Sequence, residues 1–288
     1  MKIPYYPGCT LNTVAKPFDE SAKASAITLG FELEELSEWN CCGAGFPLTN
    51  DNIMGLAAPT KVLANARAAG ETVTTLCSVC YNVLKRTNKA LNDDKERKAT
   101  INEFMELEYD GSLNIVHYLE ILRDTVGFDK VKEAVKRPLT GIKVGAYYGC
   151  MLLRPGGEVG IDNAEAPTII EDLLSALGCE PVDFPDKIEC CGAHLAMGKT
   201  DVVERLSGKI MTSAIESGAE VIVTSCPLCQ YNLDKSQEKI KSSDAGFKTV
   251  PVVYFTQLLG LALGQSEDET SLKDNQWDIR PLLAERGV

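Results

Sequence analysis

The chain has 288 residues, of which 44% are hydrophobic and 24% charged, a balance typical of a folded globular protein and unlike that of disordered chains. Its formal net charge of −12 argues against a nucleic-acid groove or an anionic membrane surface as the main partner. No apolar run approaches the roughly 20 residues of a membrane helix, and the first ten residues lack the apolar core of a secretory signal, so we expect a cytoplasmic protein without direct membrane insertion.

Short β-rich runs alternate with helical patterns along the chain. In the first half we expect strands in KIPYY, FELEEL and TVTTL, and helices at 18–29, 53–69 and 79–91. In the second half we expect strands in KVGAYY, EPVDF and EVIVTS, and helices at 167–177, 201–217 and 227–240. This alternation predicts an α/β fold with two pseudo-symmetric repeated domains, each a mainly parallel sheet flanked by helices.

Ten of the eleven cysteines form two copies of one pattern: a single cysteine, then an adjacent pair, then a CxxC motif. They are Cys9, Cys41, Cys42, Cys77 and Cys80 in the first copy, and Cys150, Cys190, Cys191, Cys226 and Cys229 in the second. The spacing from the pair to the CxxC is 35 positions in both copies. In a chain without an export signal, thiols stay reduced and bind metals more often than they form disulfides.

The repeat extends beyond the cysteines and defines the expected domains. NIVHYLEIL from Asn114 is answered by PVVYFTQLL from Pro251, and VKRPLTG interrupts the pattern between the copies. We therefore expect a first cysteine-rich domain at 1–138, a second at 139–264 and a C-terminal tail at 265–288. The second copy has eight extra positions between its first cysteine and its pair, which we assign to a glycine- and proline-rich loop at 154–166. The polar start of the tail leads to WDIRPLL, a segment that can dock on this chain or on a partner.

The cysteine positions indicate the kind of metal. Cys9, Cys77, Cys150 and Cys226 directly follow predicted strands, so they collect at the carboxyl ends of parallel sheets. A helix beginning at each CxxC would favour thiolate over thiol. Thiolates select soft or borderline metals, which leaves iron–sulfur clusters and zinc. Five cysteines per copy exceed a tetrahedral zinc site, and this favours iron–sulfur.

CCGAG and CCGAH, with an upstream GC and a downstream CxxC, resemble the duplicated CCG cysteine-rich domains of the HdrB family, the B-type subunits of heterodisulfide reductases. The resemblance covers nearly the whole chain. It implies two noncubane [4Fe-4S] clusters, one on each five-cysteine set, and a catalytic subunit that reduces a small-molecule disulfide between them, or runs the reverse reaction. It also implies two partners in a heterodisulfide reductase-type complex, one ferredoxin-like and one flavin-containing.

Two other functions remain open on the sequence. An electron-transfer CCG subunit of another oxidoreductase complex, of the lactate, glycolate, fumarate or succinate type, would need the same cysteines. A zinc-stabilised interaction protein would be colourless. The full set of ten cysteines favours the catalytic subunit.

Several other residues have both a functional and a structural interpretation. His194, which follows the second pair, is the candidate proton donor to a product thiolate, or a structural histidine. Arg154 can neutralise an anionic substrate or simply be exposed. We expect Cys179 in the core, because Phe31 occupies the equivalent position, and His117 as a packing residue in a helical pattern. The YN pairs after each CxxC, at 81–82 and 231–232, are assigned to structure.

Overall fold

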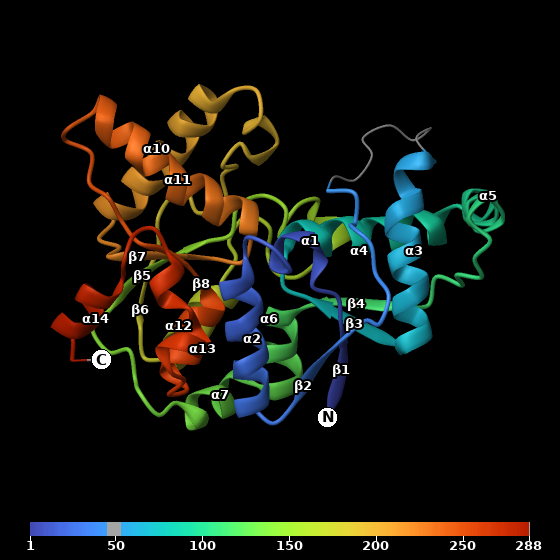
Figure 1. Ribbon diagram of the computed structural model, residues 1–288, viewed down its shortest axis with the longest axis horizontal. Helices are drawn as coiled ribbons and strands as arrows, with labels where there is room; N and C mark the ends of the chain where they lie inside the picture. Colours follow the sequence, from blue (N-terminus) through green and yellow to red (C-terminus); the bar gives the residue numbers. More distant parts are fainter. Residues whose placement is uncertain (45–52, 288) are drawn as a thin grey trace.

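The computed structural model describes residues 1–44 and 53–287 and contains two four-stranded sheets, each entirely parallel (Figure 1). The first sheet has the order β2-β1-β3-β4, with β1 Lys2–Tyr5, β2 Glu32–Glu35, β3 Thr72–Thr75 and β4 Asn114–His117. The second has the order β6-β5-β7-β8, with β5 Lys143–Tyr147, β6 Glu180–Val182, β7 Val221–Thr224 and β8 Val252–Tyr254. The predicted fold class, a duplicated α/β protein, is confirmed.

Helices cover these sheets. In the first half they are α1 Gly8–Leu11, α2 Lys16–Thr28, α3 Met54–Ala69, α4 Ser78–Asp93, α5 Lys95–Met105, α6 Tyr118–Glu120, the π-helix η1 Ile121–Val126, and α7 Phe128–Ala134. In the second half they are α8 Gly156–Val159, α9 Ile169–Ala176, the 3₁₀-helix η2 Ala193–Leu195, α10 Thr200–Glu216, α11 Pro227–Ser243, α12 Phe255–Ala262, α13 Glu267–Thr270, the 3₁₀-helix η3 Leu272–Asp274, and α14 Arg280–Glu285. Among the described helices, none is both long and apolar enough to cross a lipid bilayer.

The inner strands are buried, as parallel strands between helical layers must be. All four residues of β7 are buried, and its sequence VIVT is a continuous β-branched run. In the first sheet, β1 lies between β2 and β3, with Ile3 opposite Leu33 and Tyr5 opposite Thr74. The register brings the carboxyl ends of neighbouring strands to one edge of each sheet, where the cysteines follow.

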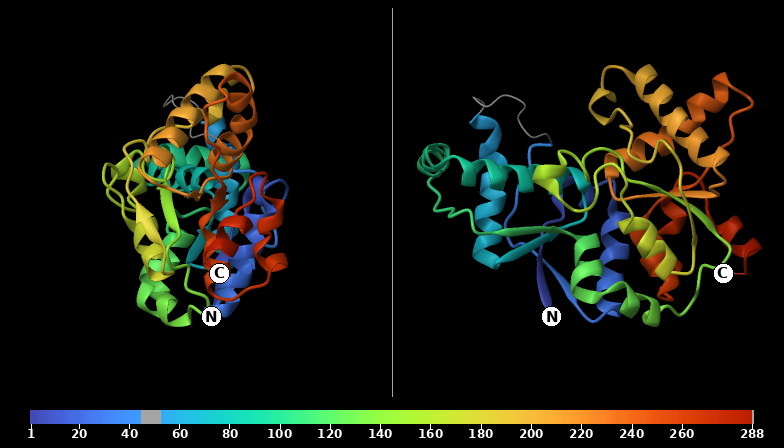
Figure 2. Two further views of the ribbon diagram at one scale, coloured as in Figure 1. Left: turned by 90° about the vertical axis from the view of Figure 1, so that its left-hand side faces the viewer. Right: turned by 180° about the vertical axis from the view of Figure 1, so that it is seen from behind.

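The two halves exchange helices. The helix that follows the last strand of the second sheet, α12, packs against α2 of the first half, and both lie between the two sheets (Figures 1 and 2). Phe18 of α2 stacks on Tyr254 with ring centroids 4.3 Å apart and meets Phe255 edge-on. The hydroxyls of Ser21 and Thr256 lie 2.6 Å apart in the buried contact.

The reciprocal contact uses the equivalent elements of the first half. After β4, the chain continues through α6 and η1 to α7, and α7 packs against α9 of the second half. Arg123 of η1 donates to the backbone oxygen of Ile161, 2.8 Å away. Each half thus gives the helices after its last strand to the other half, so neither sheet is covered by its own helices alone.

The C-terminal tail docks on this chain. Leu272, Ile279 and Leu283 are buried, and the indole of Trp277 donates to the backbone oxygen of Asp234 on α11 at 3.1 Å. Of the two alternatives for WDIRPLL, the structure therefore selects attachment to its own chain.

One sequence-based expectation is wrong. His117 is not inside a helix: it is the last residue of β4 and the N-cap of α6. Its ring nitrogen Nδ1 accepts from the backbone N–H of Leu119 at 3.2 Å, and Glu120 closes the capping box. The apolar residues after His117 give the segment from Asn114 onward a helical period, although the helix begins only at Tyr118.

Candidate functional site

The first cysteine set converges at the carboxyl edge of the first sheet. Cys9 lies in α1 directly after β1, and the adjacent pair follows β2. Cys77 is the N-cap of α4, and Cys80 lies in its first turn. The Sγ atoms of Cys9 and Cys41 are 3.7 Å apart, and those of Cys42 and Cys80 are 3.6 Å apart.

The second set repeats this arrangement. Cys191 Sγ lies 3.6 Å from Cys229 Sγ, as Cys42 lies from Cys80. Cys150 hydrogen-bonds Cys190, as Cys9 contacts Cys41. In both sets the second residue after the exposed cysteine of the pair donates its backbone N–H to that sulfur, from Gly43 at 3.4 Å and from Gly192 at 3.3 Å. The ten cysteines singled out from the sequence therefore gather into two groups of five.

Two glycines allow this close approach. Gly8 has φ +74°, and a Cβ on it would lie 2.8 Å from Cys80 Sγ. Gly149 has φ +63°, and a Cβ on it would lie 3.0 Å from Cys229 Sγ. A side chain at either position would occupy the space of a sulfur atom, and the backbone conformation itself favours glycine.

Each group stabilises some of its sulfurs as thiolates. The hydrogen bond between Cys42 and Cys80 lowers the pKa of Cys42 to about 7, and the one between Cys190 and Cys150 lowers the pKa of Cys190 to about 6. The pKa of Cys80 and that of Cys229 are raised, because each shares its proton with two neighbouring sulfurs and is buried. Thiolates are the form in which cysteine binds metals.

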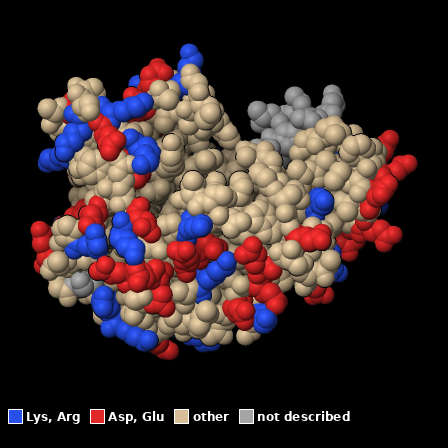
Figure 3. Space-filling model, in the orientation of Figure 1, with Lys and Arg blue, Asp and Glu red and all other residues tan. Residues whose placement is uncertain are grey.

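The groups differ in exposure from their outer to their inner members. Cys9, Cys41 and Cys190 are exposed and are called the outer cysteines. Cys42, Cys191 and the cysteines of both CxxC motifs are buried and are called the inner cysteines. Figure 3 shows a hollow between the lobe of α10 and α11 and the lobe of α3, with few charged side chains on its floor. In Figure 1, α1, which carries Cys9, lies below this hollow. The outer sulfurs are therefore open to a small reactant.

The two groups adjoin across the middle of the molecule. Ser78, next to Cys77, and Ser225, next to Cys226, have their hydroxyls 2.8 Å apart. Burial raises the pKa of Tyr254, and charges on Cys226 and Cys77 add to this shift, so its ring lies near both motifs.

The extra loop of the second half adds contacts between the two halves next to the cysteine groups. Asn82 on α4 donates to the backbone oxygens of Met151 and Arg154 at 2.8 and 2.7 Å, and Arg86 pairs with Glu158 at 2.6 Å. The loop predicted at 154–166 therefore holds the first half, and it contains α8.

The other candidates are placed as follows. His194 is exposed on η2, and its charge contributes to lowering the pKa of Cys190. Arg154 reaches the carboxylate of Glu165 at 3.4 Å and the backbone oxygen of Ile188 at 3.5 Å. Cys179 is in the core as expected, and burial raises its pKa to about 12.

Two polar residues that the sequence pattern assigned only to packing and structure lie beside the cysteines. His117 is fully buried, and its Nε2 donates to the backbone oxygen of Leu76, 2.7 Å away and next to Cys77. Burial lowers the pKa of His117 to about 3, so the ring is neutral. Asn232 donates to the sulfur of Cys191 at 3.5 Å. Its position three residues after Cys229, on the same helix face, was the available signal.

The donor chemistry fits an iron–sulfur group. Among the described residues, each group brings together cysteine sulfurs in contacts of 3.6–3.7 Å, and thiolate sulfur is the ligand that iron–sulfur clusters take. In residues 1–44 and 53–287, no three His, Cys, Asp or Glu side chains lie close enough together to hold a metal ion as they stand.

Comparison with known proteins gives consistent results. The family described as "Cysteine-rich domain" (CCG) matches residues 3–85 and 144–234. The 8-methylmenaquinol:fumarate reductase membrane anchor subunit of Wolinella succinogenes is 34% identical over 281 residues, covering 96% of this chain and 98% of that protein. The B subunit of the ferredoxin/F420H2-dependent CoB-CoM heterodisulfide reductase of Methanosarcina acetivorans is 30% identical, covering 95% and 93%.

A solved structure has the same fold. The crystal structure of a hypothetical protein from Helicobacter pylori superposes with a TM-score of 0.76 at 14% identity. The superposition covers 96% of this chain and 52% of that one.

Proposed function

This chain belongs to the cysteine-rich CCG family, in the group that includes the B subunits of heterodisulfide reductases, and from this membership we propose that it is the catalytic iron–sulfur component of a disulfide-reducing complex. Its relatives are subunits of multisubunit oxidoreductases, and its cysteine-rich repeats fit iron–sulfur electron transfer. The proposal adds the substrate class: a small disulfide that is reduced to two thiols, or the reverse reaction.

The observation that carries the proposal is the repeated pairing of sulfurs in two adjoining groups. The contact between Cys42 and Cys80 has the same length as that between Cys191 and Cys229, and the outer members of both groups are exposed. Cleavage of a disulfide consumes two electrons and two protons, and two equivalent one-electron centres meet that requirement.

We assign the ten cysteines as ligands of two noncubane [4Fe-4S] clusters. One would be held by Cys9, Cys41, Cys42, Cys77 and Cys80, and the other by Cys150, Cys190, Cys191, Cys226 and Cys229. When bound, the clusters supply single electrons. The chain holds the thiolates, keeps Cys77 and Cys226 close through the contact between Ser78 and Ser225, and leaves the outer sulfurs accessible.

His194 is the proposed proton donor to the product thiolate. It is exposed beside Cys190, so it can exchange protons with solvent. A His194→Gln variant should retain its iron and bind the disulfide, but form thiols at least tenfold more slowly in single-turnover assays. An unchanged rate would remove His194 from the mechanism.

The electrons come from partner proteins in this proposal. A ferredoxin-like partner and a flavin-containing one would complete the chain of carriers, as the resemblance to heterodisulfide reductase implies. The net charge of −12 suits contacts with partners of complementary charge, although Figure 3 shows acidic and basic side chains interspersed on the visible face.

A second function is favoured by one comparison. The 34% identity to a fumarate reductase subunit over 96% of the chain supports an electron-transfer role, in which the protein passes electrons on and touches no disulfide. Both functions require the same clusters, so only reactivity separates them.

The deciding experiment uses the anaerobically purified chain, reduced with a viologen and freed of excess reductant. Iron and acid-labile sulfide are counted first, and two four-iron clusters require about eight of each. CoB-CoM heterodisulfide, glutathione disulfide and cystine are then added in turn, and released thiols are counted. Two thiols per chain, with simultaneous oxidation of the clusters, would support the catalytic function. Clusters that stay reduced with every disulfide, yet are oxidised by an artificial acceptor, would leave the electron-transfer function.

A further inference from the structure

We propose that Asn232 is a positioning residue that hydrogen-bonds the Cys191 sulfur and makes the second-half cluster the more easily reduced of the two. This inference rests on the proposed iron–sulfur sites and deepens them, because it assigns the order in which the two sites receive electrons.

The contact is direct and buried. Asn232 lies on α11 with 3% of its surface exposed. Its amide nitrogen Nδ2 is 3.5 Å from Cys191 Sγ and 3.4 Å from the backbone oxygen of the same residue. The amide therefore holds both the side chain and the backbone of one proposed ligand.

The equivalent asparagine of the first half does something else. Asn82 lies two residues after Cys80, whereas Asn232 lies three residues after Cys229. On an α-helix, residues three apart share a face and residues two apart do not. Asn82 accordingly points away from its own cysteines, and its Nδ2 donates to the backbone oxygens of Met151 and Arg154. A one-residue offset thus breaks the symmetry of the two repeats beside their sulfurs.

No equivalent donor reaches the first-half pair within the part of the chain that the structure describes. There, the side-chain neighbours of Cys42 are other cysteines, Cys80 and Cys41. The backbone donors beside the pairs are similar, Gly43 to Cys41 and Gly192 to Cys190. Two side chains therefore distinguish the second pair: the exposed His194, whose charge contributes to lowering the pKa of Cys190, and the buried Asn232, which hydrogen-bonds the Cys191 sulfur directly.

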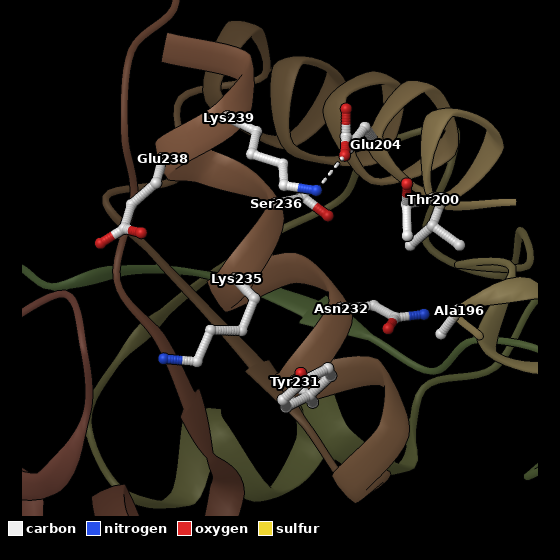
Figure 4. Close-up of a pocket in the computed structure, with 10 residues that line it drawn as sticks. Ala196, Thr200, Glu204, Tyr231, Asn232, Lys235, Ser236, Glu238 and Lys239 are labelled. Carbon is white, nitrogen blue, oxygen red and sulfur yellow. Dashed lines mark hydrogen bonds and ion pairs between the residues drawn. The ribbon is translucent and has the colours of Figure 1, made fainter. Parts of the chain in front are cut away.

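Asn232 also lines a cavity between two helices of the second half. Figure 4 shows Asn232 at one end of a cavity of about 270 Å³ between α10 and α11, with its nitrogen directed toward the loop of Ala196, which leads back to Cys191. Lys239 and Glu204, which line the same cavity, form an ion pair at 3.0 Å.

The physical consequence follows from charge. Adding an electron to a cluster makes its thiolate sulfurs more negative, and a hydrogen-bond donor stabilises the more negative state. Loss of the Asn232 donor should therefore lower the reduction potential of the second-half cluster and leave that of the first unchanged.

The test is a potentiometric titration of the full chain with its clusters, followed by electron paramagnetic resonance. Wild type and Asn232→Leu, which keeps the volume and removes the donor, are compared. We expect the higher of the two midpoint potentials to become more negative in the variant and the lower one to stay in place, and a shift of the lower potential alone would contradict the proposed order. The matched control is Asn82→Leu, which removes the equivalent amide from the first half and should not lower either potential in this way.

Three further outcomes would overturn the inference: unchanged potentials in iron-replete Asn232→Leu, equal shifts of both potentials, or the same shift in Asn82→Leu. If Asn232→Leu does not retain iron, Asn232→Thr is titrated instead, because its shorter side chain removes the amide with less crowding, and the same outcomes apply. A wild-type chain without iron and sulfide would instead refute the proposed function, so the two failures are distinguishable.

Discussion

At the residue scale, the two site glycines are as restrictive as the cysteines. A methyl group on Gly8 would lie 2.8 Å from Cys80 Sγ, closer than a carbon and a sulfur can approach, and its φ of +74° already disfavours an L-residue. The sulfur can move only by leaving its contact with Cys42.

We therefore predict that Gly8→Ala lowers the iron content of the anaerobically purified chain by about half, because one of two sites is lost. Gly30→Ala is the control, since Gly30 has φ +87° and open space around its missing Cβ. It should cost about 1–2 kcal/mol of stability from the backbone alone and retain full iron. Equal iron in both variants would show that Gly8 serves only the turn.

A buried carboxyl outside the sulfur groups gives a pH-dependent prediction. Asp234 on α11 is 5% exposed, its Oδ1 has no hydrogen-bond partner among the described residues, and burial raises its pKa to about 6. Because the folded chain binds this proton more tightly than the unfolded chain, the contribution of Asp234 to stability falls as the pH rises from about 4 to 6.

Asp234→Asn should therefore stabilise the protein at pH 8, by about 1–3 kcal/mol, and change little at pH 4.5. The measurement is anaerobic thermal unfolding of both chains at the two pH values. Asp234 lines a surface pocket together with Asp274, which is exposed. Asp274→Asn is therefore the control and should show no such difference. A gain in stability that is equal at both pH values would contradict the assignment.

At the element scale, the cysteine-bearing elements could be predicted from the sequence because their signals are local. A strand followed by a cysteine and then a helical pattern identifies α4 and α11. Cys77 is the N-cap of α4 and Cys226 is the N-cap of α11, as expected for helices that start at the CxxC motifs. Because the sequence repeats, the elements predicted for the first half also predict those of the second half.

The exchange of helices could not be predicted in this way. The residues of α2 and α12 that meet, such as Phe18 and Phe255, are ordinary apolar residues, and no local pattern says which half they cover. The fourth strand of each sheet also could not be predicted, because His117 and Tyr254 each end a short strand and immediately precede a helix.

The Asn232 contact could not be predicted because the YN motif occurs in both copies. This repetition indicates a shared structural role, although the two copies are offset by one residue.

The contact between α2 and α12 should contribute strongly to stability. Phe18 is fully buried between the rings of Tyr254 and Phe255. Phe18→Ala should cost about 3–5 kcal/mol of unfolding free energy. Phe104→Ala, at a residue that is 59% exposed on α5, is the control and should change stability by less than about 0.5 kcal/mol. Denaturant unfolding of each variant measures both values, and a loss below about 1 kcal/mol for Phe18 would mean that the helices separate easily.

At the scale of the whole molecule, the exchanged helices make the two repeats one mechanical unit. Helix α7 of the first half packs against α9 of the second half, and α12 of the second half packs against α2 of the first. The sulfur groups lie at this junction, where Ser78 meets Ser225. In the proposed function, a separation fixed by reciprocal contacts lets two clusters act on the two ends of one bond, which independent domains on a linker could not do reliably.

This arrangement predicts that the boundary between residues 138 and 139 does not separate two independently stable domains. A fragment of residues 1–138 keeps its four strands but loses α12, and it leaves Phe18 and Ser21 of α2 without their buried partners. We expect this fragment to be largely unfolded by circular dichroism and amide exchange, and to regain structure when mixed with residues 139–288. The intact chain should unfold in one transition, because separating the halves exposes the apolar faces of both α2 and α9. Two calorimetric transitions, or a fragment with dispersed amide resonances, would show instead that each sheet is stable with its own helices and that the exchange is a late docking step.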